Sequence, residues 1–171
     1  MTRIFISVGS NIEREKYSRI AIDELVLLFD EVVISSIYES EAVGFSGPSY
    51  YNFVVGASTD LSLDMLVSTL KQLEFKHGRA VDAKKNAPRT LDLDLLLYDT
   101  LVTDTPAELP RKELLTRAFV LEPMAEIAAD VVHPLTSETM QTHWQQFDAP
   151  EQVQHVVNFR WNQRDLPCHI E

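Results

Sequence analysis

The sequence lacks the long apolar run that a membrane span requires. No stretch of its 171 residues approaches roughly 18 consecutive apolar residues, and its first residues do not combine a basic region with an apolar segment, as a signal peptide does. Cysteine is nearly absent too, because the single Cys168 has no second thiol with which to form an internal disulfide or a metal site. These absences predict a cytoplasmic chain without internal disulfides.

Basic residues are also scarce. The chain has 15 Lys and Arg against 26 Asp and Glu, a net charge of −11. Nucleic acids and anionic membranes favour a basic surface, so we expect neither as a partner. Between residues 79 and 117, however, seven basic residues balance seven acidic ones. A small anion would therefore find local cations in this segment.

Apolar residues make up 45% of the chain and are spread over its whole length, which argues against disorder and against a fibrous repeat. The length suits one domain with a core of ordinary size. We predict a single domain over residues 1–161 and a flexible tail over residues 162–171. We expect the protein to be a monomer.

Hydrophobic periodicity predicts alternating strands and helices in the first hundred residues. The predicted strands cover residues 3–8, 32–38, 52–58 and 91–98, and the predicted helices cover residues 15–29 and the segment from the cap Ser62 to the stop Gly78. Residues 39–50 contain two glycines and a proline and are predicted to form a loop. The order βαββαβ favours a mostly antiparallel sheet with two helices on one face, an α+β sandwich.

The pattern is weaker beyond residue 98. We expect short helices within residues 111–128, broken at Pro123, a further helix over residues 139–147 and a strand over residues 153–160.

Two aspartates alternate with leucines at the start of the fourth predicted strand. A strand rises about 3.3 Å per residue, so Asp92 and Asp94 share one face with Cα atoms roughly 6 to 7 Å apart, while the flanking leucines face the core. Like charges so close repel each other, and a hard divalent cation would compensate them. An ordinary amphipathic strand with a polar outer face shows the same alternation, so spacing alone leaves both interpretations open.

The surroundings of the aspartate pair favour a metal–phosphate site. Pro88 and Arg89 come just before it, and a polar segment with Arg79, Lys84 and Lys85 comes before them. Magnesium keeps few protein ligands and takes the others from phosphates and water. Two aspartates with nearby arginines therefore suit a nucleotide polyphosphate and predict phosphoryl-type transfer.

Several short motifs, in order and spacing, resemble those of the 6-hydroxymethyl-7,8-dihydropterin pyrophosphokinase family over about residues 4–135. They are Val8-Gly9-Ser10-Asn11, Ser36-Ile37-Tyr38-Glu39-Ser40, Tyr50-Tyr51-Asn52, Glu74 with Gly78-Arg79, Pro88-Arg89-Thr90-Leu91-Asp92-Leu93-Asp94 and Arg117-Ala118-Phe119-Val120-Leu121. The run from Pro88 to Asp94 is the most specific of them.

The resemblance implies a ferredoxin-like α+β sandwich and a step of folate biosynthesis. In that step, pyrophosphate passes from ATP to the hydroxymethyl group of the reduced pterin, and AMP leaves. It implies two magnesium ions held by Asp92 and Asp94. It further implies catalytic roles for these aspartates and for Arg79 and Arg89, and ATP binding by Lys71, Glu74, Arg89, Arg111 and Arg117.

The resemblance also implies a pterin pocket. Tyr50 and Phe119 would stack on the ring faces, Asn52 would bind the amide-like edge, and backbone groups around Ser40, Val43 and Gly44 would complete the hydrogen bonds. Offset stacking and an amide that both donates and accepts suit a flat heteroaromatic ring. Without the resemblance, the two aromatic residues fit ordinary core packing and Asn52 fits a turn.

The chain departs from the family pattern at a few positions. Arg111 stands where the family usually has histidine, Val81 and Ala87 replace a basic residue and a glycine, and Glu41-Ala42 replace prolines. Two alternatives therefore accompany the main prediction: a paralogue with an altered pterin substrate, and a non-catalytic pterin- or nucleotide-binding module. The aspartate pair favours catalysis, because a pure binder has little need of metal ligands.

Overall fold

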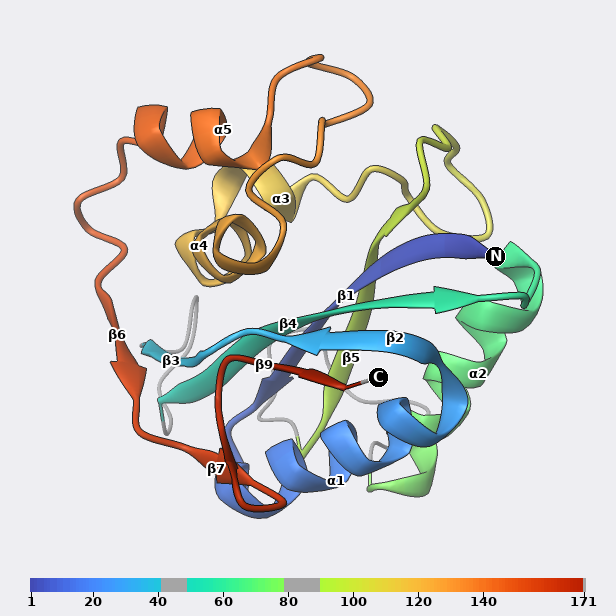
Figure 1. Ribbon diagram of the computed structural model, residues 1–171, viewed down its shortest axis with the longest axis vertical. Coiled ribbons are helices and arrows are strands. Elements are labelled where there is room, and N and C mark those ends of the chain that lie inside the picture. Colours follow the sequence, from blue (N-terminus) through green and yellow to red (C-terminus); the bar gives the residue numbers. More distant parts are fainter. Residues whose placement is uncertain (41–48, 79–89, 171) are drawn as a thin grey trace.

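An antiparallel sheet forms the centre of the molecule (Figure 1). The computed structural model describes residues 1–40, 49–78 and 90–170. Within these residues the sheet has seven strands, namely β1 (Thr2–Ser10), β2 (Asp30–Ile34), β3 (Ile37–Ser40), β4 (Tyr50–Thr59), β5 (Asp92–Tyr98), β6 (Gln154–Val157) and β9 (Cys168–Ile170). The main order is β5-β1-β4-β2-β9, and β3 pairs with both β4 and β6.

This strand order confirms the predicted fold class. The first and fourth predicted strands, β1 and β5, lie side by side, and β4 separates β1 from β2. Helices α1 (Arg14–Leu28) and α2 (Leu63–Lys76) connect the strands as the order βαββαβ requires. Every pair of strands in the sheet is antiparallel. The architecture is a ferredoxin-like α+β sandwich.

The first hydrophobic core lies between one face of the sheet and helices α1 and α2. Alternate residues of β1, β4 and β5 point into it, and so do apolar residues of the helices, among them Ile6, Phe53, Leu93, Ile22, Leu25, Leu66 and Leu70. The helical spacing of 3 to 4 residues and the strand spacing of two place these side chains on facing surfaces. This is the helix-covered face that the sequence predicted.

A second core covers the opposite face of the sheet, which the sequence did not predict. Phe5, Val54 and Leu96 pack there against α3 (Glu113–Thr116), α4 (Ala118–Ile127) and α5 (Met140–Gln146). In Figure 1 these three helices lie together on the side of the sheet away from α1. The sheet is therefore buried on both faces, which explains why residues 4–10 of β1 are all buried.

The predicted strand over residues 32–38 is wrong in one respect, because it is interrupted at Ser35 and Ser36. The Ser35 hydroxyl accepts the backbone N–H of Val54 at 2.9 Å. The backbone N–H and the hydroxyl of Ser36 both donate to the Glu126 carboxylate of α4, each at 2.7 Å. Side chains thus replace part of the backbone ladder and divide the segment into β2 and β3.

The predicted helix break at Pro123 is also wrong. Pro123 lies buried inside α4, and the interruption falls at Arg117, whose backbone is extended with φ −123 and ψ 122. A proline inside a helix loses one hydrogen bond. Burial of Val120, Leu121 and Met124 in the second core offsets that loss.

The end of the chain returns to the sheet. Residues 153–160, predicted as one strand, contain β6 and the first residue of a short pair, β7 (Arg160–Trp161) with β8 (Arg164–Asp165). The sequence predicted a flexible tail from residue 162, whereas the structure pairs β9 with β2. Leu166, Cys168 and Ile170 pack against the first core, and this apolar alternation accounts for the pairing.

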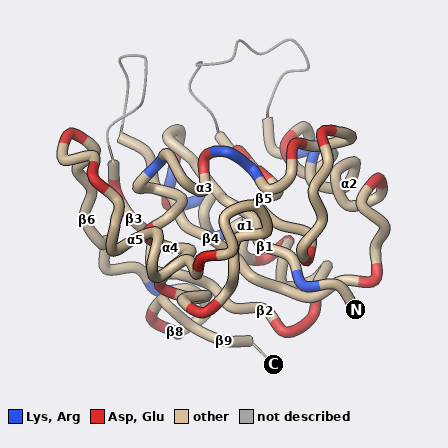
Figure 2. The backbone as a smooth tube through the Cα atoms, turned by 90° about the horizontal axis from the view of Figure 1, so that it is seen from above, with Lys and Arg blue, Asp and Glu red and all other residues tan. Residues whose placement is uncertain are grey.

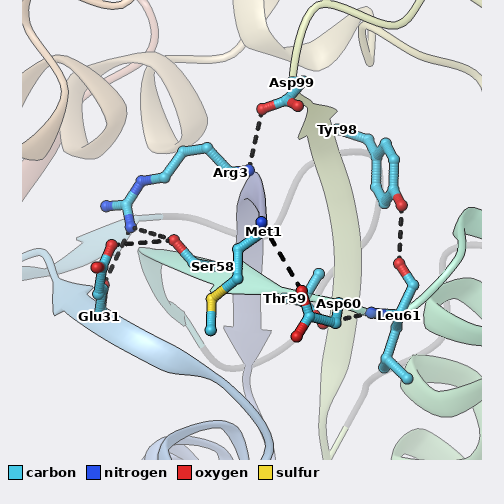
Figure 3. A network of polar contacts seen from close by, with 9 residues as sticks. All are labelled: Met1, Arg3, Glu31, Ser58, Thr59, Asp60, Leu61, Tyr98 and Asp99. Atoms are coloured by element: carbon cyan, nitrogen blue, oxygen red, sulfur yellow. Dashed lines mark hydrogen bonds and ion pairs between the residues drawn. The ribbon is translucent and has the colours of Figure 1, made fainter.

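A polar network closes the end of the sheet where β1 begins (Figure 3). Asp99 accepts the backbone N–H of Arg3 at 3.0 Å, and the Arg3 guanidinium donates to the Glu31 carbonyl at 3.0 Å. The Tyr98 hydroxyl donates to the Leu61 carbonyl at 2.7 Å. These contacts fix one end of β1 and β5 and leave their other end for the site described below. Among the described residues, no helix combines the length and the apolar character needed to cross a membrane.

Candidate active site

The candidate residues meet in a row across the sheet. Gly9 of β1 pairs with Asp92 of β5 on one side and with Asn52 of β4 on the other. Neighbouring strands lie about 4.7–4.9 Å apart, so the backbones of Asp92 and Asn52 are separated by roughly 9 to 10 Å. A predicted metal ligand and a predicted pterin ligand are thereby placed on one surface.

The aspartate pair has the geometry that its alternation predicted. Leu91, Leu93 and Leu95 are buried in the first core, while Asp92 and Asp94 are half-buried on the other face, opposite Gly9 and Ser7 of β1. Among the described residues, no group of three or more His, Cys, Asp or Glu side chains has a metal-binding arrangement. A pair of carboxylates on one strand face would suit an ion that takes its other ligands from phosphate and water.

Arg111 brings a positive charge to this pair. Its Nη2 atom lies 3.5 Å from Oδ1 of Asp94, and its Nε atom lies 3.2 Å from Oε2 of Glu113. The side chains of Arg111 and Asp94 are 31% and 34% exposed, so both remain accessible to a ligand. The backbone N–H of Arg111 donates to the Leu96 carbonyl at 3.1 Å, which fixes the arginine beside β5. In Figure 2, Lys and Arg positions, coloured blue, appear near the labels of α3 and β5.

Helix α2 carries two further predicted ATP ligands, Lys71 and Glu74, and they lie in different environments. Lys71 is exposed on the helix surface. Glu74 is only 4% exposed, and its Oε2 accepts the backbone N–H of Leu93 at 2.7 Å. The sequence suggested Glu74 as an ATP ligand but did not indicate its contact with the strand that carries the aspartates, because that contact depends on how α2 packs against β5.

The described part of the predicted pterin pocket gathers around Gly9. Asn52 is 5% exposed and donates from Nδ2 to the Ser40 hydroxyl at 3.0 Å. A Cβ atom added to Gly9 would lie 3.0 Å from Oδ1 of Asn52 and 3.6 Å from Cδ1 of Tyr50. Glycine therefore lets the amide and the tyrosine ring approach the backbone of β1, a role that glycine often has inside a strand. Gly9 belongs to the site although the sequence suggested it only as part of a motif.

Helix α4 carries Arg117 and Phe119 toward the same face of the sheet. Phe119 is partly buried against the second core, and Arg117 precedes the first residue of the helix. The hydrogen bonds from Ser36 to Glu126 attach α4 to the sheet. Burial raises the pKa of the neighbouring Tyr38 phenol, and the nearby carboxylates of Glu126 and Glu122 raise it further.

Some predicted site residues lie outside the described residues. They are the pterin-loop residues Val43 and Gly44, the catalytic arginines Arg79 and Arg89, and the departures at Glu41, Ala42, Val81 and Ala87.

Comparison with known proteins identifies the family. Residues 5–129 match the family model of 7,8-dihydro-6-hydroxymethylpterin-pyrophosphokinase. The chain belongs to this family. The predicted resemblance is thereby confirmed, and so is the predicted class of enzyme, a pyrophosphokinase that transfers pyrophosphate from ATP to a hydroxymethyldihydropterin.

Individual relatives agree with the family model. The chain is 34% identical to the 2-amino-4-hydroxy-6-hydroxymethyldihydropteridine pyrophosphokinase of Aquifex aeolicus over 138 residues, which cover 79% of this chain and 86% of that one. It is 41% identical to the enzyme of that name from Synechocystis over 123 residues, 70% of this chain and 63% of that one. It is 29% identical to the folic acid synthesis protein fol1 of Pneumocystis carinii over 95% of this chain, a match that spans only 22% of fol1.

A solved structure supports the fold. The chain resembles a crystal structure of HPPK-DHPS in complex with substrates, with a TM-score of 0.60 and 11% sequence identity. The similarity covers 84% of this chain and 43% of that one. At this level of identity the comparison bears on the fold alone.

Proposed function

We propose that this chain transfers pyrophosphate from ATP to the hydroxymethyl group of 6-hydroxymethyl-7,8-dihydropterin, with release of AMP, as a step of folate biosynthesis. The observation that supports it best is the row Asp92, Gly9 and Asn52 across three adjacent strands. A metal–phosphate end and a heteroaromatic end then lie on one surface, at a separation of roughly 9 to 10 Å set by the strand spacing.

Asp92 and Asp94 would hold magnesium, and from the family resemblance we propose two ions. The carboxylates fit the ion because they are hard oxygen ligands, half-buried on one strand face. Magnesium, when bound, would neutralise phosphate charge and so lower the barrier to attack. Arg111 lies beside Asp94 and keeps positive charge at the same position. It can bind phosphate through its guanidinium, at a position where the family usually has a histidine.

The chain's cations would bind and orient the triphosphate. Arg111 and Arg117 approach from the side of α3 and α4, and Lys71 is on α2. The family resemblance adds Arg79 and Arg89. Oriented arginines neutralise phosphate oxygens through paired hydrogen bonds and hold the reacting groups in line.

Asn52, Ser40, Tyr50 and Phe119 would bind the pterin, together with Val43 and Gly44. The Asn52 amide lies over Gly9 and donates a hydrogen bond to Ser40. These contacts fix the orientation of the amide, which can then form hydrogen bonds along one edge of the planar pterin ring. In the reaction, the hydroxymethyl oxygen forms a bond to the β-phosphorus of ATP. The bond from that phosphorus to the bridging α–β oxygen breaks, AMP takes the electron pair, and the proton of the hydroxyl passes to water.

We further propose that the protein acts as a cytoplasmic monomer on small molecules and binds neither nucleic acid nor membranes. The net charge of −11 supports the proposal that the protein binds neither nucleic acid nor anionic membranes, because it would repel these polyanions.

A non-catalytic pterin- or nucleotide-binding module and a paralogue with another pterin substrate are the competing functions. The decisive experiment incubates the protein with ATP, magnesium and 6-hydroxymethyl-7,8-dihydropterin and measures AMP. We expect AMP in proportion to the pterin consumed. Binding of both ligands without AMP, even at high protein concentration, would establish the binding module instead.

The same assay tests the aspartate pair. We expect Asp92→Ala and Asp94→Ala each to lower turnover at least about a hundredfold, because each removes charge stabilisation from the phosphates. Both variants should retain the circular dichroism spectrum of the parent, since the two side chains lie outside the hydrophobic cores. Asp104→Ala, at an exposed position, is the control and should keep full turnover. Near-normal turnover in either site variant would show that the pair is only a polar strand face.

A further inference from the structure

Glu74 is a buried carboxylate whose role the proposed reaction does not explain. It lies on α2, next to Leu70 and Leu73, which pack in the first core. Its Oε2 accepts the backbone N–H of Leu93 at 2.7 Å, and Leu93 is the residue between the two aspartates. A hydrogen bond from an N–H to an ionised carboxylate is stronger than one between neutral groups.

The geometry of β5 explains why this contact matters. β5 is an edge strand that pairs with β1. Successive N–H groups of a strand point to opposite sides, so the Leu93 N–H, which reaches Glu74, points away from β1. The backbones of Asp92 and Asp94 are then held by β1 on one side, and that of Leu93 is held by α2 on the other.

A second contact joins the same two elements. The Thr90 hydroxyl donates to the His77 carbonyl at 2.6 Å. Gly78, with φ +104, ends α2 within van der Waals distance of Thr90, since an added Cβ would lie 3.4 Å from its hydroxyl. Two hydrogen bonds therefore join the end of α2 to the start of β5, and the one made by Glu74 is nearer the carboxylate pair.

We propose that Glu74 is a positioning residue, which fixes the direction of the Asp92 and Asp94 carboxylates by holding the Leu93 N–H. This inference rests on the proposed metal site. It assigns Glu74 a role through the strand rather than through direct contact with ATP. Groups that orient metal ligands typically change metal affinity about 10- to 100-fold when removed.

The test measures cation affinity without nucleotide. Binding of Mn²⁺, a spectroscopic substitute for magnesium, is followed by electron paramagnetic resonance of the free ion. We expect Glu74→Leu, which removes the acceptor, to weaken Mn²⁺ binding about 10- to 100-fold. Glu74→Gln keeps an oxygen acceptor of the same length, so we expect it to stay within about threefold of the parent. Amide exchange of Leu93 should accelerate in Glu74→Leu and remain slow in Glu74→Gln.

A matched control lies on the same strand. Tyr98→Phe removes a hydrogen bond of the same 2.7 Å length, to Leu61, at the other end of β5. It should lower the free energy of unfolding while Mn²⁺ affinity stays at the parent value. If Glu74→Leu does not fold, Glu74→Gln still decides the proposal, because a tenfold loss there would show that charge and not position matters.

Other outcomes separate the alternatives. Parent-like Mn²⁺ binding in Glu74→Leu, with weakened binding of α,β-methylene-ATP, would overturn the proposal and make Glu74 a direct nucleotide ligand. Asp92→Ala and Asp94→Ala are measured alongside. If they also bind Mn²⁺ like the parent, the metal site itself fails, and the proposal about Glu74 fails with it.

Discussion

Gly9 shows how a single hydrogen atom in place of a side chain can shape a binding surface. The residue is paired on both sides of β1, with Asp92 and with Asn52. The Asn52 oxygen and the Tyr50 ring border the space where a Cβ would sit, at 3.0 and 3.6 Å. Because a built Cβ would lie only 3.0 Å from the amide oxygen, any larger residue requires the Asn52 amide, a predicted pterin ligand, to shift by a few tenths of an ångström.

We therefore expect Gly9→Ala to weaken pterin binding by about tenfold, equivalent to roughly 1.4 kcal/mol. Displacement of Asn52 also disturbs its hydrogen bond to Ser40. Binding of α,β-methylene-ATP should change little, since the phosphate ligands lie on the other side of β1. Calorimetric titration of the two ligands measures both effects.

Gly56→Ala is the contrasting variant. Its Cβ would lie 2.8 Å from the Phe5 ring and 2.9 Å from Val33, far from the site along the same strand pair. It should lower the free energy of unfolding by about 1–3 kcal/mol through overpacking and leave pterin affinity unchanged in the folded protein. Equal pterin losses in the two variants would mean that Gly9 acts through the core and not through the site.

At the scale of single elements, local patterns predicted what depends on local chemistry. The cap of α2 is one case, since the Ser62 hydroxyl accepts the Met65 N–H at 3.3 Å as predicted. Gly78 ends the helix with a positive φ. The break between β2 and β3 was not predictable, because Glu126, which binds Ser36, lies 90 residues away in the chain. The contact of Glu74 with Leu93 was not predictable either, because it depends on how α2 packs against β5.

The loop after α4 is an element organised around a neutral histidine. His133 is buried, and its Nδ1 accepts the backbone N–H groups of Leu135 and Thr136 at 3.1 and 3.3 Å. Burial lowers the pKa of His133 from its ordinary 6.5, and the nearby His143 lowers it further. Well above pH 6.5 the imidazole is neutral in both the folded and the unfolded chain, so it makes no pH-dependent difference to stability there.

Below about pH 6.5 the unfolded chain binds a proton that folded His133 does not, so stability falls, by at most about 1.4 kcal/mol per pH unit. His133→Asn replaces Nδ1 with an oxygen acceptor that does not titrate. We expect urea unfolding at pH 7.5 and pH 5.5 to show a smaller loss of stability on acidification in this variant than in the parent. Parallel losses would exclude His133 as the cause.

At the scale of the whole molecule, β9 near the C-terminus adds a strand to the sheet at the edge of β2. Local periodicity predicted the four strands and two helices of the central sandwich. It also predicted helices within residues 111–128 and over residues 139–147. It did not predict that these helices cover the opposite face of the sheet, nor that β9 pairs with β2, because both contacts depend on surfaces that exist only once the sheet has formed. Trp161 shows this dependence, since its Nε1 donates to Asp23 of α1 at 2.8 Å across 138 residues of sequence.

Removal of residues 162–171 tests whether the pairing of β9 with β2 stabilises the fold. The deletion removes β9 from the edge of β2 and three partly buried apolar side chains, Leu166, Cys168 and Ile170, from the first core. We expect the free energy of unfolding to fall by about 2–4 kcal/mol, on the basis of about 1 kcal/mol for each half-buried side chain and the lost strand pairing. Urea unfolding of the full chain and of the chain ending at residue 161 measures this difference.

The exposed edge of β2 in the shortened chain should also promote self-association, which light scattering detects. Pterin and ATP-analogue binding should survive in the folded fraction, because the site lies toward β5 and β1, across β4 from that edge. An unchanged urea midpoint would show that the last residues are the loosely attached tail that the sequence suggested.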